Sequence, residues 1–486
     1  MLPGIIAAMN LDPDSCYRAL TTHDSRFDGR FFVGVSSTRI YCRPVCTVRT
    51  PRRANCRFFP SAAAAEVEGY RPCLRCRPEL SPGMASVDAT ARLAQAAVDL
   101  IEAGALEDGS LEALAGRVGV TSRHLRRVFV AEFGVAPIEF AQTQRLLLAK
   151  RLLTDTALSV TEIALASGFR SLRRFNALFK TRYRMAPGRL RKAREPGALP
   201  GTLRFELAYR PPYAFDAMLA FLRDRAIPRI EAVTATTYAR SLALMHRGAM
   251  HEGVLVVRRS PRKAALAVEL SASFAHVVPV VLARVKHAFD LAADPAEIDA
   301  HLGTLAAANP GLRVPGTFDG FELAVRAIVG QQISVRAART MLGRVVDVLG
   351  APLAVPLPDI VRRFPSPAEV AAAGAPALAR CGLTPARART IAALAEAVAA
   401  GGLTLTPDAD VDATLARLLA IPGIGPWTAH YIAMRALRWP DAFLANDLVV
   451  LRALKETRPA LAQAQSEAWR PWRSYAVMHL WKGSIK

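Results

Sequence analysis

The spacing of apolar residues changes along the 486-residue chain and divides it into four predicted segments. Residues 1–82 are rich in turn-forming residues and contain one β-like run, Arg30–Ile40. From near Val87, apolar residues recur at intervals of three and four, which is typical of amphipathic helices. Because Ser81-Pro82-Gly83 interrupts the chain between these patterns, we expect a small domain at 1–82 and a helical domain at 83–196.

The helical segment contains the same pattern twice. Leu111–Ala115 is followed by Thr121–Phe129, and Val160–Ala164 is followed by Ser171–Phe179. Each pair predicts a short apolar helix, a turn and a second helix with a polar outer face. Helical spacing assigns six apolar residues of the second unit to its core: Ile163, Leu165, Phe169, Phe175, Leu178 and Phe179. We therefore predict an all-α domain with two helix-turn-helix units.

β-like patterns follow the predicted linker Glu195–Pro200. The β-like runs are Leu203–Tyr209, Ile230–Arg240, Gly253–Arg258 and Ala264–Leu270. One amphipathic helix, Ala214–Arg225, lies among them. Short runs joined by turns favour an antiparallel sheet, so we expect a small α+β domain at 201–285.

Residues 286–486 return to helical periodicity. The expected helical stretches are Phe321–Leu349, Ala386–Ala399, Asp412–Leu419, Pro426–Arg435 and Leu448–Lys455. The expected fold class is therefore multidomain: a small α+β domain, an all-α double helix-turn-helix domain, a small α+β antiparallel-sheet domain and an all-α domain.

Basic residues exceed acidic residues in every part of this picture. The counts are 63 Lys+Arg and 41 Asp+Glu, which give a formal net charge of +22. With 52% hydrophobic and 21% charged residues, the chain is too apolar to be a disordered polycation. Positive charge spread over folded domains is typical of proteins that meet a polyanion such as DNA. An Arg- and Ala-rich genome would produce the same excess without that function.

No part of the sequence predicts a membrane span or a secretory signal. No window approaches about 20 uninterrupted apolar residues, and Met1–Asn10 lacks the basic residues of a signal peptide. All but one of the seven cysteines lie within the first 76 residues, and their odd number argues against a disulfide framework. We therefore expect a cytoplasmic protein whose N-terminal cysteines bind a metal.

Two pairs of closely spaced cysteines give the strongest metal-binding signal. The pairs are Cys42 with Cys46 and Cys73 with Cys76. Four thiolates from two tight loops predict a closed tetrahedral Zn²⁺ site. Cys16 and Cys56 fall outside this spacing and are interpreted as ordinary small residues. On spacing alone, a purely structural zinc ribbon and an accidental group of reduced cysteines remain alternatives.

The residues around these cysteines carry a family resemblance. Phe31–Cys46 and Tyr70–Pro78 resemble the Ada-type methyl-phosphotriester repair domain, over about residues 10–80. The resemblance implies that Cys42, while bound to zinc, takes a methyl group directly from a methylated DNA phosphate. Methylation of one sulfur would change the formal charge of the site from about −2 to about −1 and strengthen DNA binding. The implied phosphate contacts are Thr38, Arg43, Arg49 and Arg71.

The second helix-turn-helix unit, Ile163–Pro187, resembles the AraC/XylS-type DNA-binding domain, with a likeness over about residues 88–193. In such units the exposed side chains of the second helix enter the major groove. The candidates for DNA contact are Ser122, Arg123, His124, Arg126 and Arg127 in the first unit, and Ser171, Arg173 and Arg174 in the second. The resemblance implies promoter binding and transcription activation, with RNA polymerase as a partner.

A glycine-punctuated turn, Ile421–Ala429, separates two predicted helices near the C-terminus. Gly423 and Gly425 would let backbone N–H groups approach a DNA phosphate, with a monovalent cation bridging nearby carbonyl groups. Further along, Asp447 stands immediately before the predicted helix Leu448–Lys455. The turn predicts a helix-hairpin-helix, whereas Asp447 alone is explained equally well as a helix N-cap.

Hairpin and aspartate together resemble the helix-hairpin-helix DNA glycosylases. With Gly330–Ser334 and Pro471–Trp481, residues 202–481 look like the AlkA-type 3-methyladenine DNA glycosylase II branch. The resemblance implies that Asp447 is the catalytic carboxylate, which stabilises an oxocarbenium ion as a flipped, alkylated purine leaves. The implied substrate-binding residues are Trp427, Tyr431, Trp481, Gln331 and Gln332.

The resemblance also bears on the type of reaction. Trp427 stands where bifunctional relatives place the lysine that forms a Schiff base, so a monofunctional glycosylase is implied. Cys381 is the one cysteine of this region, so the four-cysteine iron–sulfur loop of some relatives is not expected. The best-known member of this branch has a leucine that fills the gap left by the flipped base. The matching position in this sequence is Gln332, and the neighbouring Ile333 is the alternative.

These expectations combine into an alkylation-response protein, associated with the nucleoid, that acts on alkylated and promoter DNA. It joins a zinc methyl-phosphotriester sensor, a transcription activator and an alkylpurine glycosylase. No Pro-Cys-His-Arg motif is present, so an O6-alkylguanine transferase domain is not expected. Two alternatives stay open: a regulator whose glycosylase-like domain only binds DNA, and a structural zinc module that accepts no methyl group.

Overall fold

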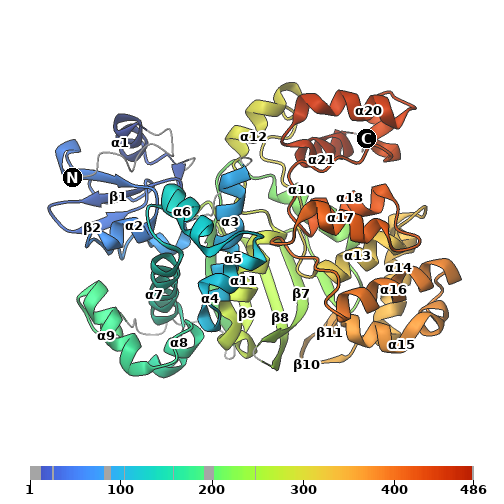
Figure 1. Ribbon diagram of the computed structural model, residues 1–486, viewed down its shortest axis with the longest axis horizontal. Coiled ribbons are helices and arrows are strands. Elements are labelled where there is room, and N and C mark those ends of the chain that lie inside the picture. The colour runs from blue at the N-terminus through green and yellow to red at the C-terminus, as the bar shows by residue number, and fades with distance from the viewer. Residues whose placement is uncertain are drawn as a thin grey trace.

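The computed structural model describes residues 12–24, 27–81, 89–102, 104–156, 158–190, 202–246 and 248–483. Met1–Asn10, Pro82, Gly83, Val87 and the Glu195–Pro200 linker lie outside these ranges. Figure 1 shows the N-terminal unit at one end of the molecule and the C-terminal helices at the other, with a helical unit and a sheet between them. Within the described ranges, no helix combines the length and apolarity needed to cross a membrane.

The N-terminal unit is built on a four-stranded sheet with the order β3-β1-β2-β4. Its elements are α1 (Pro13–Thr21), β1 (Phe32–Val35), β2 (Ile40–Cys42), β3 (Cys56–Phe59), α2 (Ala62–Val67) and β4 (Arg71–Pro72). The pairs with β1 are antiparallel, whereas β2 and β4 run parallel. The prediction of a single run at Arg30–Ile40 was wrong, because the chain turns at Arg39 (φ 54°) and begins a second strand.

The next unit consists of short helices that repeat one arrangement. Its helices are α3 (Ala89–Glu102), α4 (Ala105–Asp108), α5 (Leu111–Arg117), α6 (Ser122–Phe133), α7 (Pro137–Asp155), α8 (Val160–Ala166) and α9 (Leu172–Tyr183). Thr121 caps α6 by accepting a hydrogen bond from His124 N (3.2 Å), and Ser171 caps α9 by accepting one from Arg174 N (3.3 Å). The two predicted helix-turn-helix units, α5–α6 and α8–α9, are therefore present.

The predicted core of the second unit is correct except at one position. Ile163, Phe169, Phe175 and Phe179 are buried, and Leu178 is partly buried. Leu165 was wrongly assigned to the core, since 47% of it is exposed. The helix α8 has only seven residues and buries the face that carries Ile163, so Leu165 lies on its outer side.

The third unit is a five-stranded antiparallel sheet with the order β5-β9-β8-β7-β6. Its elements are β5 (Thr202–Ala208), α10 (Phe215–Arg225), β6 (Glu231–Val233), β7 (Thr237–His246), β8 (Ala249–Arg259), β9 (Ala265–Ser271) and α11 (Val278–Ala288). The expected single strand Ile230–Arg240 was wrong. Thr234 N donates to Thr237 O (2.9 Å), and this turn splits the run into the β6–β7 hairpin.

The remaining chain is mainly helical and includes one short hairpin, β10 (Pro352–Leu357) with β11 (Ile360–Arg362). Its helices are α12 (Pro295–Leu302), α13 (Gly320–Val329), α14 (Val335–Leu349), α15 (Pro367–Arg380), α16 (Pro385–Ala399), α17 (Val411–Leu419), α18 (Pro426–Arg435), α19 (Leu448–Ala453), α20 (Pro459–Ser466) and α21 (Arg473–Gly483). The helical stretch expected at Phe321–Leu349 breaks into two. Gln332 takes a left-handed conformation (φ 55°), and Ser334 caps α14.

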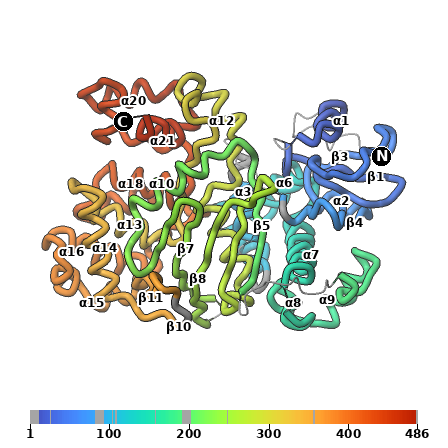
Figure 2. Tube along the Cα trace, turned by 180° about the vertical axis from the view of Figure 1, so that it is seen from behind, coloured from blue at the N-terminus to red at the C-terminus, as the bar shows by residue number. Residues whose placement is uncertain are grey.

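Hydrophobic cores cross the borders between these units. One core joins Phe32 of the N-terminal sheet to Phe129 of α6. A second joins Phe175 of α9 to Phe205 of β5, and Figure 2 shows α7 beside β5 at this border. Burial of apolar surface across the borders favours one packed assembly. The boundaries 1–82, 83–196, 201–285 and 286–486 stay a prediction.

Glu66 of α2 is a buried acid at the border between the N-terminal unit and the helical unit. Its carboxylate accepts hydrogen bonds from the Tyr41 hydroxyl (3.0 Å) and the Thr143 hydroxyl (3.0 Å). Arg182 of α9 donates to its backbone oxygen (3.1 Å). Burial raises the pKa of Glu66 from 4.5 to about 7, although these hydrogen bonds and the charges of Arg182 and Lys150 act in the opposite direction.

We predict that Glu66 makes the protein less stable as the pH rises towards neutrality. Because the pKa is higher in the folded state, the folded protein binds the additional proton. This stabilisation is full below about pH 4.5 and is lost as the pH rises through about 7. Glu66→Gln should remove up to about 3 kcal/mol of pH dependence in the free energy of unfolding, measured by urea denaturation. Exposed Glu68→Gln is the control, and an unchanged pH profile in Glu66→Gln would contradict the prediction.

Candidate functional site

The four cysteines of the N-terminal unit form one cluster, as predicted. The sulfur atoms of Cys42, Cys46, Cys73 and Cys76 all lie within 4.8 Å of one another. Cys42 ends β2 and Cys73 follows β4, so the parallel pairing of these strands brings the two cysteine pairs together. Tetrahedral Zn²⁺ with Zn–S distances of about 2.3 Å requires sulfur atoms about 3.8 Å apart. The donor set and its spacing therefore fit Zn²⁺.

Hydrogen-bond donors surround this zinc-binding cluster. Arg43 N donates to Cys76 Sγ (3.4 Å), and Arg75 N donates to Cys73 Sγ (3.4 Å). Lys150 of α7 donates to the backbone oxygen of Cys73 (3.4 Å) and to the buried Glu79 carboxylate (2.6 Å). The two backbone N–H donors favour the thiolate form of the sulfur atoms they reach. The helix between the two helix-turn-helix units thus contacts the zinc-binding loop directly.

Arg43 does not have the exposed position that a phosphate contact requires. It is 7% exposed and forms an ion pair with Asp28, and its guanidinium donates to Cys76 O (3.2 Å). In this position Arg43 holds the second cysteine loop in place, and the structure gives no support to its predicted phosphate contact. Thr38 and Arg49 are exposed and Arg71 is partly exposed, so their predicted DNA contacts stay predictions.

The candidates for major-groove contact lie on the outer faces of α6 and α9. Arg123, Arg126, Arg127, Ser171, Arg173 and Arg174 are exposed, and Ser122 and His124 are partly exposed. Arg127 contacts His124 Nδ1 (3.0 Å) across one helical turn. Both helices therefore present a polar surface, and the individual DNA contacts stay predictions.

The predicted hairpin connects α17 to α18. Gly423 has a φ of 95°, and a Cβ at this position would lie 2.1 Å from Thr390 Oγ1. Thr390 Oγ1 donates to Pro422 O (2.8 Å), so a side chain of α16 holds the turn in place. Gln331 Nε2 donates to Gly423 O (3.0 Å) and to Thr428 Oγ1 (2.9 Å). Gln331 therefore braces the hairpin, and its expected contact with the base finds no support in this position.

The carboxylate of Asp447 combines the two roles considered for it. Its Oδ1 accepts hydrogen bonds from Val449 N and Val450 N (both 3.0 Å), which makes it the N-cap of α19. Trp481 Nε1 donates to Oδ1 (3.1 Å) and Trp427 Nε1 donates to Oδ2 (2.9 Å). Two backbone N–H groups at the start of α19 and two indole N–H groups therefore fix the orientation of the carboxylate.

A cavity of about 390 Å³ lies beside Asp447. Trp427 and Tyr431 stack with ring centroids 5.1 Å apart and planes 10° apart, and Trp481 lies 6.3 Å from Tyr431. Phe221 of α10 stacks on Trp481 at 6.4 Å. The structure therefore brings the three predicted aromatic residues together around a space with flat apolar walls, which suits a flipped base.

Sequence reasoning missed three residues that line this base cavity: Phe221, Arg225 and Arg435. Phe221 and Arg225 come from α10, which follows the first strand of the five-stranded sheet. They are one helical turn apart, as Tyr431 and Arg435 are on α18, where Arg435 donates to the Tyr431 hydroxyl. This spacing is the one local signal that could have identified them.

The two candidates for the residue that replaces the flipped base occupy different surroundings. Gln332 is exposed, at the left-handed position between α13 and α14. Ile333 is partly buried, packs against the main C-terminal core and lines the base cavity. Both residues stay candidates for this role.

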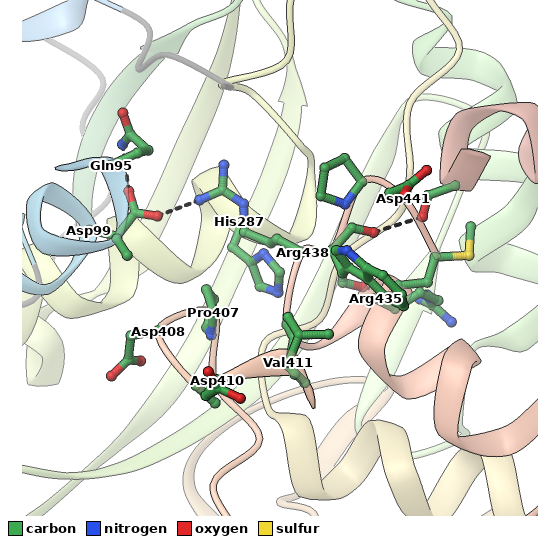
Figure 3. Close-up of a pocket in the computed structure, with 18 of the residues that line it drawn as sticks. Gln95, Asp99, His287, Pro407, Asp408, Asp410, Val411, Arg435, Arg438 and Asp441 are labelled. Atoms are coloured by element: carbon green, nitrogen blue, oxygen red, sulfur yellow. Dashed lines mark hydrogen bonds and ion pairs between the residues drawn. The ribbon is translucent and has the colours of Figure 1, made fainter. Parts of the chain in front are cut away.

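A larger cavity, of about 740 Å³, lies between the helical unit and the C-terminal helices (Figure 3). Asp99 of α3 pairs with Arg438 (2.7 Å) and accepts a hydrogen bond from Gln95 Nε2 (2.9 Å) at its edge. Arg117 and Asp408 form a second pair (2.8 Å) between the same two parts. These ion pairs connect α3 and α5 to the segment that follows α18 and to the segment that precedes α17. The helix α18 itself lines the base cavity.

Fold and site together define a helix-hairpin-helix DNA repair protein joined to a zinc-binding and helix-turn-helix regulator. Residues 15–79 match the metal binding domain of Ada, and residues 114–193 match a helix-turn-helix domain. Residues 204–319 match the AlkA N-terminal domain, and residues 325–473 match the HhH-GPD superfamily of base excision DNA repair proteins.

Individual relatives place the chain more closely. It is 38% identical over 488 residues to the "Probable bifunctional transcriptional activator/DNA repair enzyme AlkA" of Mycobacterium tuberculosis, covering 97% of each chain. It is also 38% identical to Escherichia coli DNA-3-methyladenine glycosylase 2, over 57% of this chain and 96% of that one. The "Bifunctional transcriptional activator/DNA repair enzyme AdaA" of Bacillus subtilis is 30% identical over 37% of this chain and 82% of its own. The chain belongs to the family of the bifunctional AlkA proteins.

We predict that Gly423→Ala destabilises the hairpin, whereas Gly425→Ala does not. A methyl group at Gly423 would meet Thr390 and force an unfavourable φ, but a Cβ at Gly425 has no heavy atom within 4 Å. The expected cost is about 1–3 kcal/mol for Gly423→Ala and less than about 0.5 kcal/mol for Gly425→Ala. Thermal unfolding of the two variants measures the difference. Equal melting temperatures would show that the turn does not need glycine at 423.

Proposed function

We propose that this chain responds to DNA alkylation with three activities in one polypeptide. They are the hydrolytic excision of alkylated purines of the 3-methyladenine type, acceptance of methyl groups from DNA phosphotriesters, and promoter-specific transcription activation. The four parts at 1–82, 83–196, 201–285 and 286–486 would carry them. One observation supports the excision activity above all: the Asp447 carboxylate is held by the Trp427 and Trp481 indoles at the base cavity.

Excision begins when the alkylated nucleotide leaves the stack and enters the base cavity. A purine methylated at N3 or N7 carries positive charge, so the C1′–N9 bond breaks with its electron pair moving to a base that leaves uncharged. The Asp447 carboxylate stabilises the oxocarbenium ion and orients the water that adds to C1′, and the proton of that water passes to solvent. Trp427 and Tyr431 offer electron-rich faces to the cationic base.

The residue at position 427 restricts the reaction to this single step. Tryptophan has no primary amine and forms no Schiff base with the exposed sugar. The enzyme is therefore proposed to be a monofunctional glycosylase that leaves the DNA strand intact.

Cys42 is the proposed methyl acceptor of the zinc-binding cluster. Bound Zn²⁺ would keep the four thiolates deprotonated at neutral pH. Cys42 Sγ forms the new bond to the methyl carbon while the methyl–oxygen bond breaks, and an ordinary phosphodiester anion remains. The site then carries one negative charge fewer, so repulsion of the DNA backbone weakens. Thr38, Arg49 and Arg71 are the proposed backbone contacts.

The regulator and the hairpin complete the proposal. The polar faces of α6 and α9 would read two major-groove sites of one promoter, with RNA polymerase as the partner in activation. Backbone groups near Gly423 and Gly425 would bind a DNA phosphate, with a monovalent cation at the turn carbonyls. We place the protein in the cytoplasm at the nucleoid, where its DNA substrates lie.

Asp447→Asn tests the catalytic role of the carboxylate. Release of methylated adenine from alkylated duplex DNA under single-turnover conditions should fall about 100-fold or more. Asparagine caps a helix as well as aspartate does, so α19 should persist. The matched control is Asp410→Asn, which caps α17 through Ala413 N (2.7 Å) and does not line the base cavity. Equal release by wild type and Asp447→Asn would contradict the catalytic role of Asp447, and no release by wild type would favour a domain that only binds DNA.

Mass analysis tests the methyl acceptor. After incubation with methyl-phosphotriester DNA, the full-length chain should gain one methyl group on Cys42, and Cys42→Ser should gain none. Cys56→Ser is the control, since this thiol lies outside the zinc-binding cluster and hydrogen-bonds to Arg52 O (3.4 Å). If wild type gains no methyl group on Cys42, the methyl-acceptor proposal is contradicted and the zinc module is purely structural.

A further inference from the structure

Two arginines hold the end of α10 against the helices on either side of the loop Gly330–Ser334. Arg326 Nη1 of α13 donates to Arg225 O (2.9 Å), and Arg339 Nε of α14 donates to Ala226 O (2.9 Å). The last carbonyl groups of a helix have no partner within the helix, and positive charge near them is favourable. The two guanidinium groups therefore join the C-terminal end of α10 to α13 and to α14.

Arg326 is a fixed support in this arrangement. Its Nε donates to Glu322 (2.9 Å) and its Nη2 donates to Glu231 (2.5 Å), and Glu231 also accepts a hydrogen bond from Ile227 N (2.8 Å). Both carboxylates are buried. Every nitrogen of the Arg326 guanidinium thus has an acceptor, and a substitution at this position would break a buried network of charges.

Arg339 makes a single polar contact of this kind. It is partly exposed, and within the described ranges the hydrogen bond to Ala226 O is the one that its side chain makes. The helices α10 and α14 also pack against each other, so they keep other contacts when this hydrogen bond is lost. Arg339 is therefore the residue at which the connection between α14 and α10 can be weakened selectively.

The loop between α13 and α14 carries the two candidates for the residue that replaces the flipped base. Gly330 N donates to Arg326 O (3.0 Å) at the end of α13, and Ser334 caps the start of α14. Gln332 and Ile333 lie between these two points. The helices that contact the end of α10 therefore also fix both ends of this loop.

The helix α10 forms one wall of the base cavity. Its Phe221 ring stacks on the Trp481 ring, with centroids 6.4 Å apart and planes 16° apart. Trp481 Nε1 in turn donates to Asp447 Oδ1 (3.1 Å). A shift of α10 would therefore move a ring that lies against a hydrogen-bond donor of the Asp447 carboxylate.

We propose that Arg339 is a positioning residue of the glycosylase, which fixes the α10 wall of the base cavity relative to the loop that enters the DNA. Phe221 is then in place when the loop fills the gap left by the flipped base, and the nucleotide is held in the reactive orientation as the C1′–N9 bond breaks. The proposal rests on the glycosylase function proposed above. Arg339 acts through α10 and not on the reacting atoms.

Arg339→Met in the full-length chain tests this role, because it keeps the apolar stem and removes the donor to Ala226 O. Single-turnover base release from a duplex with one 7-methylguanine, at saturating protein, should fall about 10- to 100-fold. The affinity for the same duplex with an abasic site should change less than about threefold, because no base has to be held. Arg339→Lys, which restores a donor, should recover part of the rate. Arg344→Met, at an exposed position of α14 outside the cavity lining, should match wild type.

A double-mutant cycle with Phe221→Leu shows whether Arg339 acts through α10. The effects of two residues that act through one contact are not additive. The proposal predicts that Arg339→Met lowers release less than about threefold in the Phe221→Leu background. Additive losses, or a fall in abasic-site affinity that matches the loss of release, would overturn the proposal and favour a direct contact of Arg339 with the DNA backbone.

The outcomes separate this inference from the proposed function. Release of no base by wild type would overturn both. Normal release by a folded Arg339→Met, with an active wild type, would overturn the positioning role alone. If thermal unfolding shows that Arg339→Met does not fold, Arg339→Lys decides: the proposal requires a slower release that is not additive with Phe221→Leu, and an additive or absent effect contradicts it.

Discussion

The carboxylate of Asp447 accepts hydrogen bonds from three helices, and the arrangement of the base cavity depends on it. The backbone of α19 supplies two donors, and Trp427 of α18 and Trp481 of α21 supply one indole N–H each. An indole has a single N–H donor. The hydrogen bond to Asp447 therefore restricts the orientation of each tryptophan ring. These same rings form walls of the cavity. An unpaired buried N–H costs about 1–3 kcal/mol, which ties the shape of the cavity to the presence of the charge.

Polar contacts also connect the zinc-binding unit, the helical unit and the C-terminal helices. The Lys150–Glu79 pair is 1% and 3% exposed and joins α7 to the loop after Cys76. At the other side of the same unit, Asp99 forms a partly exposed pair with Arg438, which follows α18. Breaking a buried pair at one partner typically costs about 3–5 kcal/mol. The zinc-binding cluster, the DNA-reading helices and the base cavity therefore belong to one continuous set of packed elements.

Local patterns predicted the parts of the sites that are local in sequence. The cysteine pairs, the hairpin glycines and the aromatic residues around Trp427 can each be recognised from a short stretch of sequence. The contacts of Arg43 and Gln331 could not be predicted locally, because their partners, Asp28 and the hairpin, lie elsewhere in the chain. Periodicity locates helices but does not say which distant group a polar side chain will meet.

The same limit explains the errors in the fold. β-like residues continue through the Thr234–Thr237 turn, and apolar periodicity continues across Gln332, so only tertiary packing reveals the two breaks. Leu165 has core-like chemistry but sits on a helix too short to be covered on that side. The contribution of α10 to the lining of the base cavity could not be predicted, because it depends on how the five-stranded sheet unit packs against the C-terminal helices.

The central claim is that Asp447 stabilises a positive charge at the sugar while the base departs. A secondary isotope effect from deuterium at C1′, measured on base release under single-turnover conditions, tests this claim most directly. The account predicts slower release of the deuterated nucleotide, because C1′ becomes planar as the oxocarbenium ion forms before water adds. Equal rates for the two isotopes, with bond cleavage rate-limiting, would contradict it.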